Sequence, residues 1–568
     1  MSEASGWQRL TTWMPGLRLF TAYDRAHLAG DLASGLVVAL VVIPSAIAYA
    51  DLAHCPPIAG LYAALGGMIA FALFTSSRHV IAGPDAAIAI LVGAAVGPLS
   101  GGDPGQVVVL STWLALLAAC ILLLAGWLKL GGVAEFLSSP VMLGFMNGAA
   151  VVIIGSQIGK LCGIGLHEEN TLLRLLEWGG RLRETHGPTL AFGLGAVAVL
   201  AGLRRWYPRV PGTIVVFTLA LVAGRCVDFG SLHVSVIGAV DTRIPSPVPP
   251  ELALAEVGQL LIGALGLALL IFPEGILLGR AMASRHQYEI QADQELLALG
   301  MANLAAGFFR SFAVGGSQSR TLLNSTTGGQ TQMVSLFAAG LLVGFMYFLA
   351  AWIATLPNVA IAAILIFTGL TLIEVRELRT LRRQDKQSGL IAWLTTLGVI
   401  AFGVLPGILV GIMLSLLLLL KQIARPQDAL LGRVPGAPGL HDVGDDEAAR
   451  TIPGLVVYRF YGPLLFANVR FFIERVEHFI AQEAQPVRQV ILDARAVPTI
   501  DVTAAEQLRT FIGRLRDRGM RFVVAKAHLP LREAAHRLGL NESFPKETHY
   551  AKLADAVAAF EAAEASKD

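Results

Sequence analysis

Long apolar runs follow one another along the first three quarters of the chain, separated by short polar stretches. The longer runs reach the roughly 20 residues that a helix needs to cross a bilayer. The pattern therefore predicts a polytopic α-helical membrane protein with about fourteen spans. The fourteen runs lie at 32–52, 57–74, 84–98, 107–128, 139–158, 189–204, 212–226, 256–279, 293–309, 317–326, 333–356, 358–373, 388–403 and 405–421.

Several runs are too short to span a bilayer, notably those that begin at Pro84 and Ser317. A polar, glycine-rich stretch at 311–331 surrounds the second of them. Irregular backbone at membrane depth is tolerated only against protein or a watery cavity. A helix that opens at Ser317 would aim free N–H groups into such a cavity, where they bind anions. Arg320 adds a positive charge, so this segment is interpreted as half of an anion-binding site.

The two halves of the helical region resemble each other. Residues 42–47 (Val-Ile-Pro-Ser-Ala-Ile) are similar to residues 271–276 (Ile-Phe-Pro-Glu-Gly-Ile). At nearly the same spacing, 80–84 corresponds to 312–316. Two matches at one spacing indicate a seven-plus-seven repeat, and an odd number of spans in each repeat makes the halves inverted.

This repeat predicts the geometry of the two short segments. The third and tenth segments become antiparallel half-helices whose N-termini face each other. Short strands at 79–83 and 311–315 are expected to pair, because exposed backbone groups at that depth need partners.

The composition supports a membrane protein with a soluble appendage. Of 568 residues, 55% are hydrophobic and 15% are charged, with a mean hydropathy of +0.64, whereas soluble chains have about 25% charged residues. No cleavable signal peptide is expected near the N-terminus. The four cysteines show no paired or metal-like spacing and are interpreted as packing residues; they are Cys55, Cys120, Cys162 and Cys226.

Clusters of Arg and Lys set the predicted orientation. With a cytoplasmic N-terminus, the clusters after the sixth, eighth, twelfth and fourteenth runs all fall inside, as the positive-inside rule requires. Both termini are therefore expected in the cytoplasm, with the chain in the plasma membrane, in a bacterium the inner membrane. The clusters comprise Arg204, Arg205, Arg209, Arg280, Arg285, Arg376, Arg379, Arg382, Arg383, Lys386, Lys421 and Arg425.

The composition changes abruptly after the last run. Residues 426–451 are rich in Gly and Pro and are predicted to form a linker. From 452 to 568, β-type runs alternate with amphipathic stretches, which is typical of a small soluble α/β domain. The predicted division is an N-terminal cytoplasmic segment 1–30, a transmembrane domain 31–425, this linker and the soluble domain.

Several motifs together resemble the SulP (sulfate permease) family of anion transporters with a C-terminal STAS domain, and the resemblance covers nearly the whole chain. The most specific are Pro-Pro-x-x-Gly-Leu-Tyr and Gly-Ser-x-Ser-Arg-Thr. The matching residues are Asp31-Leu32, Ile43-Pro44, Pro56-Pro57, Gly60-Leu61-Tyr62, Ser77-Arg78, Gly83-Pro84, Gly315 to Thr321, and Asp493 to Asp501.

The resemblance implies a uracil-permease-like fold, usually dimeric. A mobile core domain comprises spans 1–4 and 8–11, and a gate domain comprises spans 5–7 and 12–14. Transport in the family resembles an elevator, in which the core carries the anion past the gate. Relatives handle sulfate, bicarbonate, chloride or dicarboxylates, and the sequence does not select among these anions.

The resemblance also implies an anion site at the two half-helix openings. Capping of a buried helix is the alternative role for Ser319 and Thr321, and pairing with an acid is the alternative for Arg320. In this chain the candidate substrate-binding residues are Ser45, Tyr49, Gly83, Asp85, Gly316, Ser317, Gln318, Ser319 and Arg320.

Asp85 departs from the family pattern, in which the residue after Gly-Pro is commonly uncharged. In one interpretation Asp85 suits a helix N-terminus, as Pro84 does at the first helical position. In the other, Asp85 titrates or pairs with Arg320 and makes the anion site sensitive to protons. Both interpretations stay open.

Glu274 lies within the eighth apolar run, and an intramembrane carboxylate is by default a functional residue. The resemblance implies a proton carrier at this position. Sodium-coupled relatives have Asp with Thr four residues later, where this chain has Glu274 and Leu278, so sodium would lose an oxygen ligand. Proton coupling is favoured; pairing with Arg320 or capping by Ser45 are the structural alternatives.

In the soluble domain, Thr503 follows Asp501 of the STAS signature and is a candidate phosphorylation site, with helix N-capping as the alternative role. The STAS resemblance suggests a cytoplasmic protein partner for this domain. No cofactor, metal or nucleic acid is expected, and no motif indicates an enzyme. The remaining alternatives to a proton-coupled symporter are a sodium-coupled bicarbonate importer, an uncoupled exchanger or channel, and an anion sensor that signals through STAS. Nucleobase permeases share the fold but lack the Gly-Ser-x-Ser-Arg-Thr motif and normally lack a STAS domain.

Overall fold

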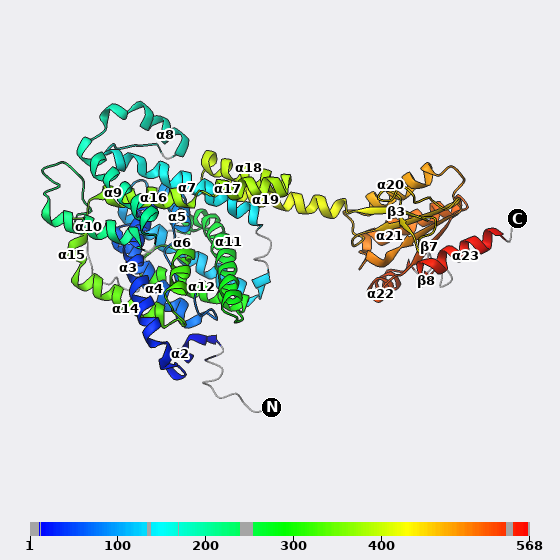
Figure 1. The fold of residues 1–568 in the computed structure, drawn as a ribbon, viewed down its shortest axis with the longest axis horizontal. Coiled ribbons are helices and arrows are strands. Elements are labelled where there is room, and N and C mark those ends of the chain that lie inside the picture. Colours follow the sequence, from blue (N-terminus) through cyan, green and yellow to red (C-terminus); the bar gives the residue numbers. More distant parts are fainter. Residues whose placement is uncertain are drawn as a thin grey trace. The chain divides into compact units, whose positions relative to one another are not determined.

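The computed structural model describes residues 11, 13–132, 138–168, 170–208, 210–238, 254–540 and 549–565. It divides into two compact units, Met1–Ser415 and Leu416–Asp568. The first unit is helical and the second contains a central sheet (Figure 1). The predicted helical domain followed by an α/β domain is confirmed.

Every predicted apolar run corresponds to a helix. Eight of the described helices are long and apolar enough to cross a membrane, and α5 and α13 are short, as the third and tenth segments were expected to be. The fourteen helices are α3 (Leu28–Leu52), α4 (Pro57–Phe74), α5 (Ala86–Ser100), α6 (Pro104–Trp127), α7 (Ser139–Cys162), α9 (Gly187–Trp206), α10 (Gly212–Cys226), α11 (Leu254–Arg285), α12 (Ala292–Phe308), α13 (Gln318–Thr326), α14 (Met333–Phe348), α16 (Asn358–Leu372), α18 (Lys386–Phe402) and α19 (Val404–Ala424).

The connections contain further short helices that the apolar pattern does not predict. Because α8 and α17 are amphipathic, neither forms a continuous apolar run. Asn170 caps α8 by accepting hydrogen bonds from the N–H groups of Leu172 and Leu173. These helices are η1 (Pro15–Leu17), α2 (Arg18–Thr21), η2 (Arg25–His27), α8 (Thr171–Gly180), η4 (Leu182–Glu184), α15 (Ala350–Ile353) and α17 (Val375–Gln384).

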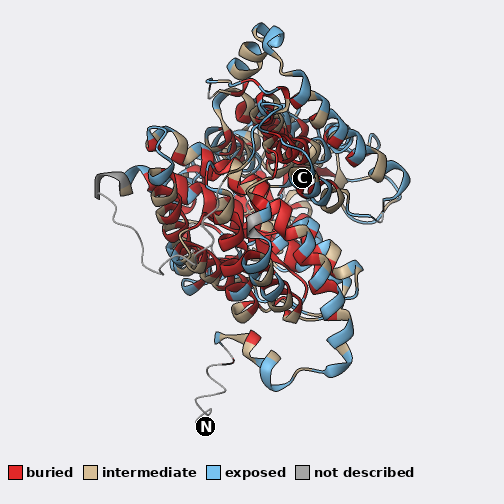
Figure 2. Cartoon of the chain, turned by 90° about the vertical axis from the view of Figure 1, so that its left-hand side faces the viewer, coloured by how far each residue is buried: buried red, intermediate tan, exposed pale blue. Residues whose placement is uncertain are grey.

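The membrane helices pack in two groups. In the first, called the core, α12 packs against α4 and α6, α14 against α3, and α11 against α6. In the second, called the gate, α7 packs against α16 and α18, and α16 against α9. Small residues permit the close approaches, since a Cβ on Gly60 would lie 1.9 Å from the carbonyl oxygen of Ala46. Buried residues concentrate in the interior of this unit (Figure 2).

A two-strand pairing joins the two halves of the core. β1 (Ala82–Gly83) pairs antiparallel with β2 (Gly315–Gly316), with Gly83 opposite Gly315. All four residues are buried, and the pairing lies within or next to the predicted strands. Gly83 has φ of +153°, which L side chains rarely adopt, and a Cβ there would approach the Arg320 guanidinium to 3.3 Å.

The second unit is a six-stranded sheet in the order β4-β3-β5-β6-β7-β8, parallel from β5 to β8. The predicted strands near 455–460, 490–492 and 522–524 are β5, β6 and β7. Helices cover the sheet and bury two apolar cores. The elements are β3 (Asp428–Gly432), β4 (His441–Asp442), β5 (Leu455–Phe460), α20 (Val469–Gln482), β6 (Gln489–Asp493), η5 (Ala494–Ala496), α21 (Val502–Asp517), β7 (Arg521–Ala525), α22 (Leu529–Arg537), β8 (His549–Tyr550) and α23 (Leu553–Ala565).

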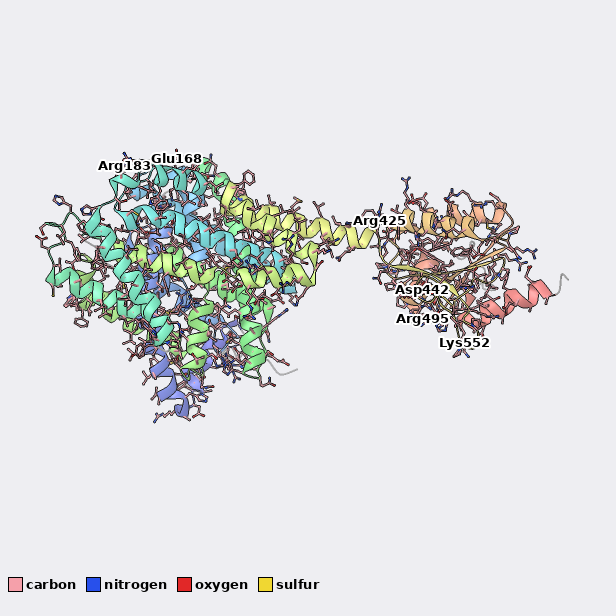
Figure 3. The ribbon with its side chains drawn as sticks, turned by 45° about the horizontal axis from the view of Figure 1, so that its top comes forward. Glu168, Arg183, Arg425, Asp442, Arg495 and Lys552 are labelled. Atoms are coloured by element: carbon pink, nitrogen blue, oxygen red, sulfur yellow. The ribbon has the colours of Figure 1, made fainter. Side chains whose placement is uncertain are left out.

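The predicted linker at 426–451 is wrong in part, because it contributes two strands to this sheet. β3 pairs antiparallel with both β4 and β5, and Leu431 is 1% exposed in the apolar core under α23. Asp442 is labelled in β4 in Figure 3. The Gly and Pro residues of this stretch surround strands too short to give a clear sequence pattern.

Candidate functional site

The β1–β2 pairing brings two helix openings together. Each strand is followed within a few residues by a half-helix, α5 after β1 and α13 after β2. Because the strands are paired and antiparallel, the two helices start from the same place in the core. The first N–H groups of a helix have no partner within the helix, and its N-terminus is electropositive. Two such openings therefore meet where the sequence predicted an anion site.

The opening of α13 has no side-chain cap. Ser317 is its N-cap residue, yet the hydroxyl of Ser317 lies 3.4 Å from that of Ser319 instead of accepting from the helix backbone. The Ser317 N–H donates to the carbonyl oxygen of Ile81. Ser317 is 1% exposed, whereas Gln318 and Ser319 are exposed. Neither Ser317 nor Ser319 therefore caps this helix with its side chain. The N–H groups of the first turn can donate hydrogen bonds to an anion instead.

The opening of α5 is capped by a carboxylate of its own. Asp85 is the N-cap residue, and its Oδ1 accepts a hydrogen bond of 3.0 Å from the Ala87 N–H. The interpretation of Asp85 as a residue of the helix N-terminus is confirmed. The helix begins at Ala86, however, so Pro84 precedes the cap and is not the first helical position. Asp85 is only partly buried. The two openings thus differ, since one carries an internal negative charge and the other does not.

Arg320 connects the N-terminal openings of α5 and α13 through a hydrogen bond. It is 1% exposed, and its Nη2 donates a hydrogen bond of 2.7 Å to the carbonyl oxygen of Pro84. Among the described residues Arg320 makes no ion pair within 4.0 Å, so the predicted pairing with Asp85 is not a direct contact. The Arg320 Nε is buried without a hydrogen-bond partner in the same described part. Among the described residues, the positive charge of Arg320 is therefore not neutralised by a carboxylate in direct contact.

The rest of α13 holds the segment that leads into β1. The Thr321 hydroxyl accepts a hydrogen bond from the Ile81 N–H at 3.0 Å. The Asn324 side-chain amide donates to the carbonyl oxygen of His79 at 2.8 Å. Thr321 therefore acts on the connecting segment and does not face an anion at the helix opening.

Glu274 of α11 lies beside these openings. A Cβ on Gly316 would lie 3.4 Å from the Cα of Gly275, which places α11 against β2. Glu274 and Asp85 lie close enough for the two carboxylates to repel each other when both are ionised, and the phenol of Tyr49 lies within electrostatic range of Asp85 and Arg320. Four of the predicted residues, from α3, α5, α11 and α13, are thus brought together.

Glu274 has no hydrogen bond or ion pair with any residue in the described ranges, and it is only partly buried. The alternatives of pairing with Arg320 or capping by Ser45 are therefore wrong. The Ser45 hydroxyl donates to the carbonyl oxygens of Val41 and Val42 in its own helix. The hydroxyl of Ser45 is therefore already hydrogen-bonded to the backbone of α3 near Pro44.

Two buried carboxylates that hold the connecting segments were missed as functional residues. Glu295 of α12 accepts hydrogen bonds from the Thr75 hydroxyl and from the N–H groups of Ser76 and Ser77. Asp31 of α3 accepts from the Gln330 N–H at 2.7 Å and from the Thr331 hydroxyl at 2.6 Å. The sequence does contain a signal for both residues, because each is an acidic residue at the start of an apolar run. Both carboxylates are saturated with donors and serve to position the core.

In the second unit, Thr503 is exposed near the start of α21. The predicted N-capping role belongs to Asp501, which accepts a hydrogen bond from the Ala504 N–H at 2.7 Å. The same carboxylate accepts from the Phe466 N–H at 2.7 Å. Thr503 therefore does not cap α21. A capping role gives no argument against phosphorylation of Thr503, which stays a prediction.

Comparisons with known proteins give a consistent family. The sulfate permease family matches residues 28–396, and the STAS domain matches residues 448–556. A protein named "probable sulfate transporter" from Mycobacterium tuberculosis is 36% identical over 96% of this chain and 98% of its own length. The chloroplastic sulfate transporter 4.1 of Arabidopsis thaliana is 26% identical, covering 97% of this chain and 84% of the relative.

Solved structures share the fold. Murine solute carrier 26 family member A9, an anion transporter in the inward-facing state, superposes with a TM-score of 0.92 at 22% identity, covering 99% of this chain and 96% of that one. The transmembrane domain of a cyanobacterial bicarbonate transporter, BicA, gives a TM-score of 0.61 at 21% identity, covering 69% and 98%.

The fold is thus the seven-plus-seven inverted repeat followed by a STAS domain, as predicted. Members of this family are transporters and not enzymes. On the family match over residues 28–396 and the 36% identity along nearly the whole chain, this multi-pass membrane protein belongs to the sulfate permease family of anion transporters.

Proposed function

We propose that this protein is a secondary active transporter that carries a small inorganic or carboxylate anion together with protons, by elevator movement of the core past the gate. The observation that carries the proposal is the asymmetry of the two helix openings beside an unpartnered carboxylate. One opening is uncapped at Ser317, the other is capped by Asp85, and Glu274 has no partner in the described ranges.

The anion binds at the opening of α13. The first-turn amides and the hydroxyl groups of Ser317 and Ser319 are the donors, and Gln318 is exposed beside them. Arg320 supplies positive potential through its charge, since its donors are directed to the backbone of Pro84. Gly83 permits the close approach of the Arg320 guanidinium, and Gly316 permits the close approach of α11 at Gly275. Tyr49 lines the same region from α3.

Glu274 carries the coupling proton. A carboxylate with no internal partner, next to Asp85 and a bound anion, would add a third negative charge to one small region. Moving that charge through an apolar gate costs a large desolvation energy, and a proton on Glu274 removes it. Sodium is less suitable, because Leu278 offers no oxygen ligand one turn after Glu274.

The division into core and gate helices supports the proposed elevator movement. The site residues lie on α3, α5, α11 and α13, which all belong to the core. The core can therefore carry a bound anion as one body. We also propose a homodimer in the plasma membrane, in bacteria the inner membrane, with both termini and the STAS domain in the cytoplasm and a cytoplasmic partner on STAS.

Uptake into proteoliposomes tests the proposal. Labelled sulfate, bicarbonate and a dicarboxylate are offered singly and in competition, with an inward proton gradient and with sodium absent or present. Accumulation of one of these anions that requires the proton gradient and ignores sodium is expected. Uptake that requires sodium and ignores the proton gradient would overturn the proton assignment in favour of a sodium-coupled bicarbonate importer. Anion binding without any uptake would favour a sensor.

A further inference from the structure

A polar contact joins the core to the gate at one end of their helices. Asp51 lies in the last turn of α3, in the core, and Lys160 lies in the last turn of α7, in the gate. The Lys160 Nζ is 2.5 Å and 2.6 Å from the two carboxylate oxygens of Asp51. The Gln157 side-chain amide donates to the same carboxylate at 3.1 Å. Asp51 is therefore held by two residues of the gate.

The contact lies on the membrane face opposite the N-terminus. The chain enters α3 from the N-terminal segment, and Asp51 is at the far end of that helix. Tyr49 of the anion site precedes Asp51 by two positions on the same helix. Any displacement of the core along the gate changes the separation of Asp51 and Lys160, because each is fixed to a different group of helices.

Gln157, Asp51 and Lys160 differ in how far they are buried. Gln157 is 2% exposed, whereas the side chains of Asp51 and Lys160 are 29% and 44% exposed. A partly hydrated ion pair contributes little to folding stability, because water competes for both charges. Such a contact can be broken and formed again at low cost. Its geometry suits a reversible closure more than a permanent structural link.

We propose that Asp51, Gln157 and Lys160 form a closure between the core and the gate that is broken and remade in each transport cycle. The three act as positioning residues: they hold the core in the conformation of this structure, with the face opposite the N-terminus closed. This inference rests on the elevator movement proposed above. It assigns the equilibrium between the two end states of that movement to one polar contact between the core and the gate.

Cross-linking tests the movement directly. Asp51→Cys and Lys160→Cys are introduced together after Cys120→Ser and Cys226→Ser remove the two exposed native thiols. A short bifunctional thiosulfonate reagent then joins the new cysteines, and mass spectrometry reports the extent of linkage. Sulfate uptake into proteoliposomes is expected to stop on linkage and to return after dithiothreitol. Linked protein that takes up sulfate at the unlinked rate would overturn the inference.

Charge variants test the closure without a cross-link. Asp51→Asn and Lys160→Gln should each shift the maximal rate of sulfate uptake severalfold while sulfate binding stays constant. The exchanged pair Asp51→Lys with Lys160→Asp should return the rate towards that of the wild type. Glu184→Gln is the matched control, because Glu184 pairs with Arg181 entirely on the gate side. Equal rates in all of these variants would contradict the inference.

The outcomes separate this inference from the proposed function. If the wild-type protein takes up none of the tested anions, the proposed transport fails and the closure fails with it. If the wild type accumulates sulfate while linkage and charge variants have no effect, transport stands and only the closure is wrong.

Discussion

The guanidinium group of Arg320 donates a 2.7 Å hydrogen bond to the carbonyl oxygen of Pro84. This bond joins the first turn of α13 to the residue that precedes the cap of α5. The two residues are far apart in the sequence and lie in opposite halves of the inverted repeat. Arg320 therefore has two roles, because it sets the spacing of the two helix openings and supplies charge near them.

The first prediction concerns Arg320→Ala. We expect sulfate binding to weaken by about tenfold or more, because unit charges several ångströms apart interact by more than ~1.4 kcal/mol at an effective dielectric of about 20. The variant should also lose about 1–3 kcal/mol of stability, because the Pro84 carbonyl is left buried without a partner. Binding by calorimetry and thermal unfolding in detergent measure the two effects.

Ser319→Leu separates the two roles of Arg320. Ser319 is exposed at the opening of α13, so a larger side chain there should block the anion with little effect on the unfolding temperature. Leu322→Phe, at an exposed position of the same helix, is the control. Unchanged sulfate affinity in a folded Arg320→Ala variant would remove Arg320 from the site.

The second prediction concerns Asp85→Asn. The amide oxygen of Asn still caps α5, but the negative charge is gone. Sulfate affinity should rise by about tenfold or more, because unit charges several ångströms apart interact by more than ~1.4 kcal/mol at an effective dielectric of about 20. Titration of purified protein with sulfate at low salt measures the change.

Asp103→Asn is the matched control for this variant. Asp103 caps α6 in the same way, by accepting a 2.9 Å hydrogen bond from the Gly105 N–H, and it is exposed. An equal rise in affinity in both variants would indicate a general effect of net charge. Unchanged affinity in Asp85→Asn would show that the carboxylate does not compete with the anion.

The third prediction concerns Glu274→Gln. The neutral side chain mimics protonated Glu274, so sulfate binding and exchange should persist. Uphill uptake driven by an outside solution more acidic than the inside should be lost. Counterflow and gradient-driven uptake in the same proteoliposome preparation measure the two activities. Proton-driven accumulation that survives in Glu274→Gln would transfer the coupling role to Asp85.

The fourth prediction concerns removal of the STAS domain. A chain that ends after Arg425 keeps all residues of the anion site, which lie in the unit Met1–Ser415. Its sulfate affinity should stay within about twofold of the full-length value, because the removed residues include none of the proposed site residues. Transport rate or dimer assembly should fall. A folded truncated protein that binds no sulfate would refute this division of labour.

The fifth prediction concerns acid sensitivity of the connection between α7 and α9. Glu177 accepts hydrogen bonds from the N–H groups of Glu168 and His167 and from Arg181, which lower its pKa from 4.5 to about 2. Because the folded pKa is depressed, the stabilisation is complete above pH 4.5 and is lost as the pH falls towards 2.

Hydrogen exchange across this connection, corrected for intrinsic rates, should show the loss of protection over that range of pH. Glu168 and Arg183 mark the connection in Figure 3. Glu177→Gln should already show reduced protection at neutral pH. Protection that does not change between neutral pH and pH 2 would contradict the assigned role of Glu177.

The sequence alone was sufficient for the membrane helices and for the strand pairing that brings the two helix openings together. Apolar runs report directly on burial in a bilayer, so each of the fourteen runs became a helix. The repeated motifs led to the pairing of Gly83 with Gly315, because inverted repeats bring equivalent segments together. The strands β5, β6 and β7 were equally visible, since they are continuous β-type runs.

Only the tertiary structure decided which polar groups meet. A carboxylate can cap its own helix, pair with a cation or remain unpartnered, and these choices depend on distances between segments remote in the sequence. Asp85 caps α5, Glu295 holds residues 75–77, and Asp51 binds Lys160 across the core and the gate. Short strands such as β3 form because β5 offers an edge to pair with, which no local pattern records.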